Sequence, residues 1–248
     1  VPVYAGCDEP LIAKVKNLIP PEIQDKETKD KFGKYYIPQF MGFMEDAHIE
    51  NKHAVDFIIE SIHKYPHEVT IFGIGPLTNI AMAIRKDPSI VPLIKEIRIM
   101  GGDPTDINIK EWNIFCDPEA AHIVFDAKVP IYEVGLNVTL KCQLTQEYRD
   151  ILTNIHDDRF TLLTKMMEKW FKHYEFTVPV MHDPLAVATM FGDFCEFEKL
   201  PLTVGLENEK RAVTYCDKIG NDVYSAKKVN VDAFFKYFIK TIFEIDKN

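Results

Sequence analysis

Residues 69–84 read VTIFGIGPLTNIAMAI, and the hydrophobic period changes inside this stretch. The run from Val69 to Phe72 is β-branched and aromatic, which predicts a short buried strand. From Pro76 to Arg85 the apolar side chains recur at helical spacing, and the glycines between the two runs permit a tight turn. A strand that turns directly into a helix predicts one half of a β–α–β unit.

The same alternation continues on both sides of this stretch. The pattern predicts a helix over His53–Tyr65, strands over Glu96–Met100 and Val129–Val134, and a helix from Asp117 to Phe125. This rhythm indicates an α/β fold whose mostly parallel central sheet is flanked by helices. Because ligands bind at the carboxyl ends of the strands in such sheets, the loops that follow these strands are the places to search for a site.

The rest of the chain predicts further elements and a single domain. We expect helices over Thr145–Asp150, Asp157–Tyr174 and Val231–Ile245, and late strands over Leu200–Val204, Ala212–Cys216 and Val223–Lys228 as an antiparallel addition to the sheet. The charged and proline-containing stretch Pro20–Lys34 predicts an exposed loop. Without a repeat or a low-complexity tract, residues 1–248 are interpreted as one domain.

Composition restricts the classes of partner. The 248 residues are 46% hydrophobic and 27% charged, which is typical of a soluble globular protein, and no apolar run is long enough for a membrane span. A net charge of −9 argues against nucleic acid or an anionic membrane and leaves neutral small molecules open. The start at Val1 lacks the pattern of a signal peptide. Five scattered cysteines without a C-x-x-C pair favour reduced thiols in the cytoplasm over a zinc or dithiol site.

Two glycine pairs follow predicted strands. The segment Gly73–Asn79 lets the backbone approach a ligand, although a tight turn with Pro76 near the first helical position explains the same pattern. The missing third glycine argues against a dinucleotide-binding oxidoreductase. After Gly101-Gly102, the side chains of Glu111 and Asn113 lie in a predicted loop before a helix. They can bond sugar hydroxyls, or they are solvated loop residues.

The third segment is His182-Asp183-Pro184. Asp183 is a good N-cap and Pro184 a good first helical residue, as in Asp87-Pro88 and Asp117-Pro118. A carboxylate is also a hard oxygen ligand for Ca²⁺, and an imidazole can donate a proton near neutral pH. The segment alone leaves both interpretations open.

Taken together and in order, these segments closely resemble the nucleoside hydrolase family that prefers inosine and uridine. The resemblance rests on residues 73–81 (GIGPLTNIA), 99–102 (IMGG), 111–113 (EWN), 117–121 (DPEAA) and 182–184 (HDP). Residues 134–139 (VGLNVT) resemble a V-G-L-D-V-T segment, with Asn137 in place of Asp. The opening VPVYAG resembles a segment that normally lies well inside the chain, so the match covers nearly all 248 residues.

The resemblance implies a Rossmann-like open sheet and a glycosidase activity. The implied reaction is Ca²⁺-assisted hydrolysis of the N-glycosidic bond of ribonucleosides to free base and ribose, in purine and pyrimidine nucleoside catabolism. Water attacks C1′ through an oxocarbenium-like transition state. A cytoplasmic homo-oligomer that binds nucleosides, and neither nucleic acid nor membranes, is also implied.

The resemblance further implies a role for particular residues. Asp183 matches a Ca²⁺ ligand, and Ile74 occupies the position whose backbone carbonyl completes the metal shell. Glu111 and Asn113 match residues that bind ribose hydroxyls, while Asn108 is a weaker match of the same kind because its loop is short. His182 matches the acid for the leaving base. Tyr174 aligns loosely with a mobile segment that covers the base.

The chain departs from the family pattern at two further places. The D-x-D-x-x-x-D-D segment, which supplies the water-activating Asp, most metal carboxylates and the first central strand, is not in this sequence, and Tyr36–Ile49 stands near the place of H-G-x-D-G-L-G-G without its glycines. We therefore expect the 248 residues alone neither to bind Ca²⁺ tightly nor to hydrolyse nucleosides efficiently, unless a stretch such as Glu45-Asp46 supplies the site. The alternative is a catalytically impaired, nucleoside-binding relative or fragment.

Overall fold

The computed structural model describes residues 1–12, 48–153, 155, 158–174 and 178–244. The chain divides into two compact units. The first comprises Val1–Lys14, Ile49–Cys142 and Met181–Asn248, and the second comprises Val15–His48 and Gln143–Val180. The predicted loop Pro20–Lys34, the stretch Glu45-Asp46 and all but the last two residues of Tyr36–Ile49 lie outside the described residues. The expectation of one domain stays a prediction.

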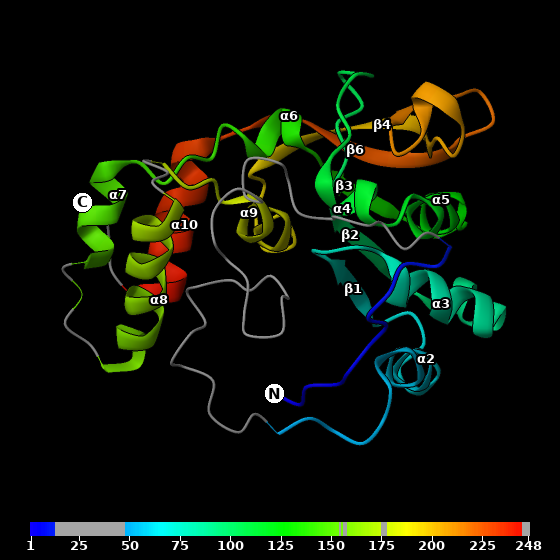
Figure 1. Cartoon of the computed structure of the whole chain (residues 1–248), viewed down its shortest axis with the longest axis horizontal. Helices are drawn as coiled ribbons and strands as arrows, with labels where there is room; N and C mark the ends of the chain where they lie inside the picture. Colours follow the sequence, from blue (N-terminus) through cyan, green and yellow to red (C-terminus); the bar gives the residue numbers. More distant parts are fainter. Residues whose placement is uncertain (13–47, 154, 156–157, 175–177, 245–248) are drawn as a thin grey trace. The chain divides into compact units, whose positions relative to one another are not determined.

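Within the described residues, the first unit contains a six-stranded sheet in the order β1-β2-β3-β6-β4-β5 (Figure 1). Its strands are β1 Thr70–Gly73, β2 Glu96–Met100, β3 Ile131–Val134, β4 Cys195–Val204, β5 Thr214–Cys216 and β6 Asn221–Val229. The pairs β1–β2, β2–β3 and β3–β6 are parallel, which confirms the predicted mostly parallel sheet. The predicted antiparallel addition holds for β4 and β5, since β4 pairs antiparallel with both of its neighbours. The prediction was wrong for β6, because β6 pairs parallel with β3 and so continues the parallel part of the sheet.

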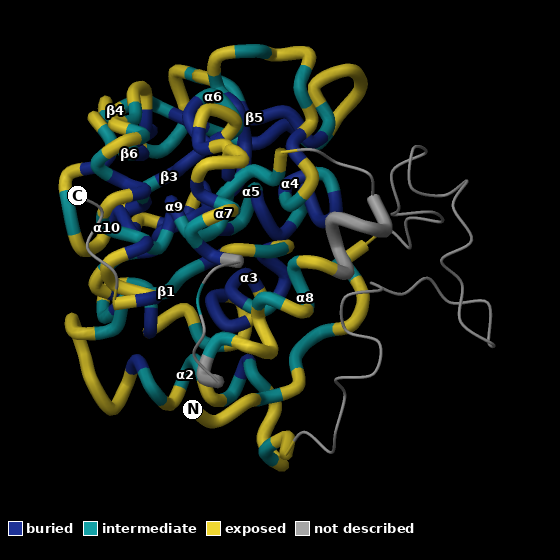
Figure 2. Tube along the Cα trace, turned by 90° about the vertical axis from the view of Figure 1, so that its left-hand side faces the viewer, coloured by how far each residue is buried: buried dark blue, intermediate teal, exposed yellow. Residues whose placement is uncertain are grey.

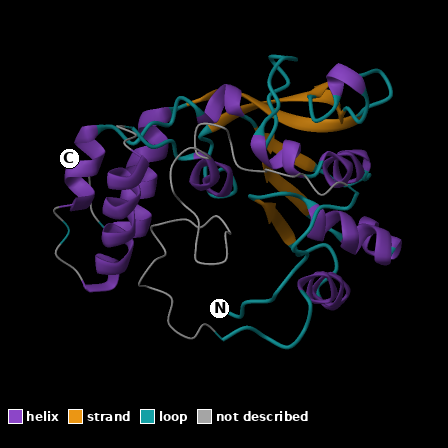
Figure 3. Ribbon diagram, in the orientation of Figure 1, coloured by secondary structure: helices purple, strands orange, loops and turns teal. Residues whose placement is uncertain are grey.

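The helices begin and end close to their predicted bounds. In the first unit they are α2 Ala54–Lys64, α3 Thr78–Lys86, η2 Pro88–Leu93, α4 Trp112–Cys116, α5 Pro118–Asp126, α6 Leu136–Thr139, α9 His182–Ala188, η3 Asn208–Lys210 and α10 Val231–Phe243 (Figure 3). The second unit contains α7 Gln146–Thr153 and α8 Asp158–Tyr174. Pro76 was predicted near the first helical position, but α3 begins only at Thr78 after the N-cap Leu77, so Pro76 belongs to the preceding turn.

Helices cover both faces of the parallel part of the sheet (Figure 1). Side chains alternate along a strand, so Ile99 of β2 joins the core with residues of α3 and α5, while Arg98 points to the opposite face. The Arg98 guanidinium donates to Thr189 Oγ1 at the end of α9 at 2.9 Å, to Glu96 Oε1 at 2.8 Å, and lies 4.3 Å from the centre of the Tyr132 ring. Figure 2 shows the buried segments concentrated along these strands. Burial of strands on both faces is typical of parallel sheets.

The carboxylate of Asp117 connects three segments of the first unit. It is fully buried, and it accepts hydrogen bonds from Leu11 N at 3.0 Å, Thr78 Oγ1 at 2.7 Å and Ala120 N at 3.0 Å. Asp117 is also the N-cap of α5, as its place before Pro118 predicted. A single side chain therefore joins the N-terminal segment to the starts of α3 and α5.

The N-terminal segment is also held at Asn79 of α3. The side-chain oxygen of Asn79 accepts a hydrogen bond from Cys7 N at 2.8 Å. A Cβ on Gly6 would lie 2.5 Å from that oxygen, so the close approach requires glycine. The Thr-Asn pair that ends the GPLTN segment thus has a structural role through both of its side chains.

The five cysteines are all free thiols. Cys116 and Cys142 are buried, Cys7 and Cys195 are half-buried, and Cys216 is exposed. Burial raises the pKa of Cys116 to about 11 and the pKa of both Cys142 and Cys195 to about 12. In the described part of the chain, no helix combines the length and the apolar character needed to cross a membrane.

We expect Asp117→Ala to lower the free energy of unfolding by about 3 kcal/mol, because it removes a helix cap and leaves buried donors unsatisfied. Urea denaturation followed by circular dichroism measures the change. Asp126→Ala, an exposed position in the same helix, is the matched control and should change stability by at most about 0.5 kcal/mol. Equal losses in the two variants would contradict the role of the Asp117 hydrogen bonds.

Candidate active site at the carboxyl ends of the strands

The loops after β1, β2 and β3 lie at one edge of the sheet, because the three strands are parallel. Backbone hydrogen bonds join two of these loops: Gly101 N donates to Val134 O at 3.4 Å, and Leu136 N donates to Gly102 O at 2.9 Å. This edge is where the sequence predicted a ligand site.

Glu111 is the most constrained polar side chain at this edge. It is only 4% exposed, and its carboxylate accepts hydrogen bonds from Gly102 N at 3.2 Å, Asn113 N at 3.0 Å and Ile114 N at 3.1 Å. It is the N-cap of α4. The solvated-loop interpretation of Glu111 was therefore wrong, because backbone donors compensate the burial of its charge.

The charge of Glu111 interacts with that of Asp183. Burial raises the pKa of the Glu111 carboxyl, the three backbone N–H groups act in the opposite direction, and the negative charge of Asp183 adds to the increase. The fold therefore places these two acidic side chains, which are 72 positions apart in the sequence, within electrostatic reach of each other.

The two asparagines have different surroundings. Asn113 lies inside α4 rather than in the predicted loop, and its side-chain amide donates to Met100 O, the last carbonyl of β2, at 3.0 Å. The helix was missed because five residues are too few to show a period. Asn108 is exposed, and its Nδ2 donates to Asp106 Oδ1 at 2.9 Å, so its hydrogen bonds stay within its own loop.

His182 is the first residue of α9 and lies against Thr139 of α6. Its Nδ1 is 2.8 Å from Thr139 Oγ1, and that hydroxyl is fully buried. Burial lowers the pKa of the His182 imidazole below its usual value of 6.5. The ring is therefore mainly neutral at neutral pH, and the Thr139 contact fixes its orientation.

Asp183 does not cap its helix. The N-cap of α9 is Met181, without a side-chain cap, and Asp183 lies in the first turn, so the N-cap interpretation was wrong. Burial raises the pKa of the Asp183 carboxyl, which accepts no hydrogen bond from the residues that the structure describes. This half-buried carboxylate is available to a ligand.

Ile74 and Asp183 line the same pocket, which has a volume of about 360 Å³. Ile74 follows β1 and is 44% exposed, and the remaining wall comes from α9, α10 and Phe191. A carboxylate and a backbone carbonyl are the oxygen donors that Ca²⁺ prefers, so both positions fit part of a shell that needs roughly 6–8 oxygens. Within the described ranges, three or more His, Cys, Asp or Glu side chains do not cluster as metal ligands would.

Tyr174 is the last residue of α8 and belongs to the second unit. Its side chain lies outside the described part of the structure. Its expected place over the base stays a prediction.

Sequence reasoning missed Thr139, although it closes the quoted VGLNVT segment. Its hydroxyl contacts His182 from 43 positions away. A threonine at the end of a short helix carries no local signal of this contact, since only the tertiary fold brings α6 to α9.

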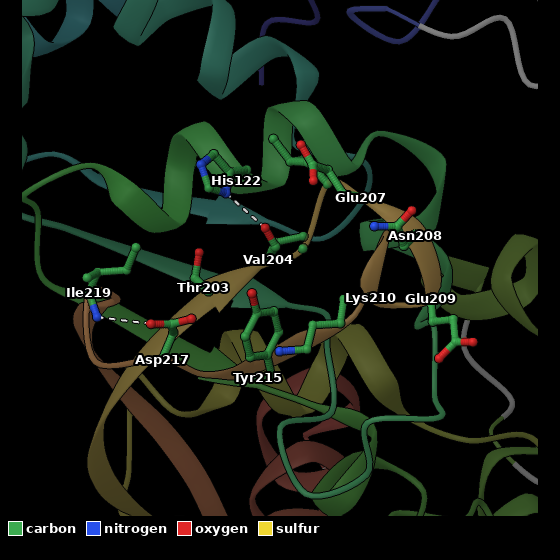
Figure 4. A pocket seen from close by; sticks show the side chains of 12 residues that line it. His122, Thr203, Val204, Glu207, Asn208, Glu209, Lys210, Tyr215, Asp217 and Ile219 are labelled. Atoms are coloured by element: carbon green, nitrogen blue, oxygen red, sulfur yellow. Dashed lines mark hydrogen bonds between the residues drawn. The ribbon is translucent and has the colours of Figure 1, made fainter.

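A larger pocket of about 620 Å³ lies elsewhere in the first unit, beside β4, β5 and α5 (Figure 4). Several of its polar side chains already have partners. His122 Nδ1 is 2.8 Å from Val204 O, Lys210 Nζ lies 4.2 Å from the centre of the Tyr215 ring, and Asp217 accepts from Ile219 N at 3.1 Å. None of the predicted site residues lines this pocket, so the strand-end site is the better candidate.

Comparisons of sequence match most of the chain to one family. A model of the family described as inosine-uridine preferring nucleoside hydrolase matches residues 1–236. The inosine-uridine preferring nucleoside hydrolase of Leishmania major is 34% identical over 214 residues, which are 83% of this chain and 65% of the relative. The pyrimidine-specific ribonucleoside hydrolase RihB of Shigella flexneri is 29% identical over 229 residues, which are 89% of this chain and 70% of the relative. The chain thus spans slightly less than two thirds of the Leishmania major protein.

Solved structures show the same architecture. A purine-preferring ribonucleoside hydrolase from Gardnerella vaginalis superposes with a TM-score of 0.81 at 28% identity, covering 96% of this chain and 78% of that one. A plant nucleoside hydrolase gives a TM-score of 0.81 at 22% identity, covering 97% of this chain and 80% of that one, and supports the fold alone.

We expect the imidazole of His182 to titrate below pH 6.5, because burial disfavours its charged form. Its neutral form then stabilises the folded state above pH 6.5, and this contribution is lost as the pH falls. Heteronuclear NMR measures the titration, with His182→Gln to assign the signal. The wild type should lose stability relative to His182→Gln on acidification. Titration at or above pH 6.5 would contradict this description.

Proposed function

Because the chain belongs to the inosine-uridine preferring nucleoside hydrolase family, we propose that it hydrolyses the N-glycosidic bond of ribonucleosides to free base and ribose. The observation that carries this proposal is the meeting of Glu111, His182 and Asp183 at one strand-end edge of a unit that the family model matches. In the reaction the C1′–N bond breaks and its electron pair leaves with the base. The oxygen of water bonds to C1′, and the net proton goes to the base.

Glu111 is suited to bind the ribose. A carboxylate has about four lone-pair directions, and the three backbone donors occupy three of them. The remaining direction can accept a ribose hydroxyl. Asn113 commits one amide hydrogen to Met100 O, which orients the amide and leaves its side-chain oxygen to accept a second hydroxyl. Both side chains are held before the sugar arrives, which reduces the entropy lost on binding.

His182 is proposed to assist the leaving base. With Nδ1 against Thr139, the neutral ring directs its other nitrogen away from that contact. A neutral ring with its hydrogen on that nitrogen can hydrogen-bond to the departing base. Transfer of a proton to the base needs the imidazolium form, which the lowered pKa makes a minor species at neutral pH. General-acid assistance by the imidazolium contributes about 10²–10⁴-fold to a rate.

We propose that Asp183 and the backbone carbonyl of Ile74 supply two of the oxygen ligands of a Ca²⁺ ion. When bound, such an ion lowers the pKa of a coordinated water and neutralises negative charge. The unpaired Asp183 carboxylate and its position beside Ile74 support this assignment. The negative charge of Asp183 would then be compensated, which would lessen its repulsion of Glu111.

The base preference and the assembly are further proposals. The names of the relatives include inosine-uridine, pyrimidine-specific and purine-preferring enzymes, so one purine and one pyrimidine ribonucleoside are both suitable substrates to assay. We retain a cytoplasmic homo-oligomer without nucleic acid or membrane partners as the proposed state, and sedimentation velocity tests the assembly.

The function is tested in a form of the chain extended by a D-x-D-x-x-x-D-D segment, because the 248 residues alone are expected to hydrolyse nucleosides poorly. This form is incubated with inosine and with uridine, with added Ca²⁺ or with a chelator, and free ribose is measured. Ribose release that depends on Glu111 supports hydrolysis. Saturable binding of nucleoside without ribose release would instead identify a nucleoside-binding relative. If the protein neither binds nucleosides nor releases ribose, the proposal is overturned.

We expect His182→Ala to slow hydrolysis of inosine more than hydrolysis of nitrophenyl riboside, because a good leaving group needs no proton. The expected loss with inosine is about 10²–10⁴-fold in kcat. Steady-state kinetics on both substrates measure the difference, with Thr139→Val to separate orientation from proton donation. Equal losses on both substrates would leave His182 with a structural role only.

In a form of the chain extended by a D-x-D-x-x-x-D-D segment, we expect Asp183→Asn to weaken Ca²⁺ binding by at least roughly tenfold, because the amide carries no charge to offset the dehydration of the ion. Isothermal titration calorimetry measures the affinity. Asp193→Asn, an exposed position after the same helix, is the matched control and should not change it. An unchanged affinity in the Asp183 variant would place the ion elsewhere.

A further inference from the structure

A second buried carboxyl lies beneath the proposed site and has no role in the chemistry described above. Glu133 is the third residue of β3, fully buried, and in register with Ile99 of β2 and Ser225 of β6. Its Oε2 accepts a hydrogen bond from Ser225 Oγ at 2.6 Å. Its Oε1 has no hydrogen-bond partner among the described residues.

Two other buried oxygens near Glu133 Oε1 also lack a described partner, Asn137 Oδ1 and Thr214 Oγ1. Gly102 and Gly135 lie between these oxygens and show that the oxygens are close to one another. A Cβ on Gly102 would lie 2.8 Å from Thr214 Oγ1 and 3.3 Å from Glu133 Oε1. A Cβ on Gly135 would collide with Glu133 Oε1 and lie 2.6 Å from Gly102 O and 2.9 Å from Asn137 Oδ1.

Two acceptor oxygens, Asn137 Oδ1 and Gly102 O, therefore lie close to Glu133 Oε1 around Gly102 and Gly135, and the Thr214 hydroxyl beside them can donate or accept. The orientation of Asn137 is fixed, because its Nδ2 donates to Ala226 O at 2.7 Å and a flipped amide would put two oxygens together. Gly102 O already accepts from Leu136 N at 2.9 Å and has a second lone pair free. An ionised Glu133 would add a third acceptor to this group, whereas a protonated one would supply the missing donor.

We propose that Glu133 is a positioning residue that keeps its own proton and donates it from Oε1 to the facing oxygens of Asn137 and Gly102. Gly102 N in turn donates to Glu111 Oε2 at 3.2 Å. The peptide of Gly102 therefore connects the buried acid to the side chain assigned to ribose. The part of the inference that concerns ribose rests on the proposed function, while the protonation of Glu133 does not.

The surroundings of Glu133 favour its neutral form. Burial raises its pKa to about 8, and the negative charges of Asp103 and Glu111 add to the increase. The neighbours from β2, β6, α6 and β5 are Ile99, Ser225, Asn137 and Thr214, which do not titrate. Arg98 points to the opposite face of the sheet and is paired with Glu96 there.

Gly102 connects the protonation state of Glu133 to the position of Glu111. Its φ of +83° is a left-handed conformation, and Thr214 Oγ1 leaves no room for a side chain. The backbone there is set by its hydrogen bonds to Leu136 and Glu111. A negative charge on Glu133 would repel Gly102 O. The resulting shift of the Gly102 peptide would weaken the hydrogen bond from Gly102 N to Glu111.

The decisive variant is Glu133→Gln in the full chain, because an amide reproduces the protonated acid. Its NH₂ can donate to Asn137 while its oxygen accepts from Ser225. Infrared spectroscopy at neutral pH should show the band of a protonated carboxylic acid in the wild type that is lost in Glu133→Gln and kept in Glu207→Gln, an exposed control. Absence of such a band in the wild type would overturn the proposal.

Stability as a function of pH provides a second readout. The folded state keeps the proton up to about pH 8, while the unfolded chain releases it near the ordinary value of 4.5, so the stabilisation is complete below pH 4.5 and is lost as the pH rises to about 8. The unfolding constant of the wild type should therefore rise relative to that of Glu133→Gln by up to about tenfold per pH unit in this window. A ratio that does not change with pH would show that Glu133 is ionised in the folded state.

Two measurements test the positioning role of Glu133: the NMR shift of the Gly102 amide and the affinity of the protein for ribose. Glu133→Gln should leave the ¹⁵N–¹H shift of Gly102 and the affinity for ribose unchanged at pH 7, and Glu133→Ala should change both. If Gly102 responds but ribose does not bind to any form, the proposed function fails and the positioning of Glu111 stands. If Glu133→Ala leaves the Gly102 shift unchanged, the positioning role fails, whatever ribose does.

Discussion

Three backbone N–H groups converge on the buried carboxylate of Glu111. One belongs to Gly102 after β2 and the other two to the first turn of α4, so the carboxylate joins both ends of the loop between them. Burial of an ionised group is costly unless donors surround it, and these donors must keep their places for Glu111 to stay buried. The positions of Asn113, of the β2 end and of the glycine pair all follow from this requirement.

Hydrogen bonding and exposure together separate the acidic groups that hold the fold from those that are open to a ligand. Asp117 has three donors from three segments and no exposed surface, so its remaining lone-pair direction is closed to a ligand. Glu111 also has three, with one lone-pair direction left. Asp183 accepts none from the described residues, although it is half-buried. The similar Asp-Pro dipeptides at positions 117 and 183 therefore have different roles. Asp117 connects segments of the fold and Asp183 is open to a ligand, because their tertiary surroundings differ.

Hydrophobic periodicity was sufficient to predict the longer elements and the class of the fold. The β-branched runs and the helical spacing in residues 69–84 predicted β1 and α3 within two residues of their observed bounds. Local patterns could not determine where α9 begins, because Asp-Pro favours a cap at Asp183 while the chain enters the helix at His182. Nor could they place β6, since the direction of a strand depends on the strands that pair with it. Glu133 carried no signal, as a single acidic residue inside a short strand is ordinarily solvated.

The distribution of the thiols has a practical consequence. Alkylating reagents react with the thiolate, and burial keeps Cys116, Cys142 and Cys195 protonated at neutral pH. Cys216 is exposed at the end of β5, two residues beyond Thr214. Cys7 is half-buried, and burial raises its pKa as well. A maleimide fluorophore should therefore attach first at Cys216. Emission from that label would follow the β5 end of the sheet in real time without an engineered cysteine.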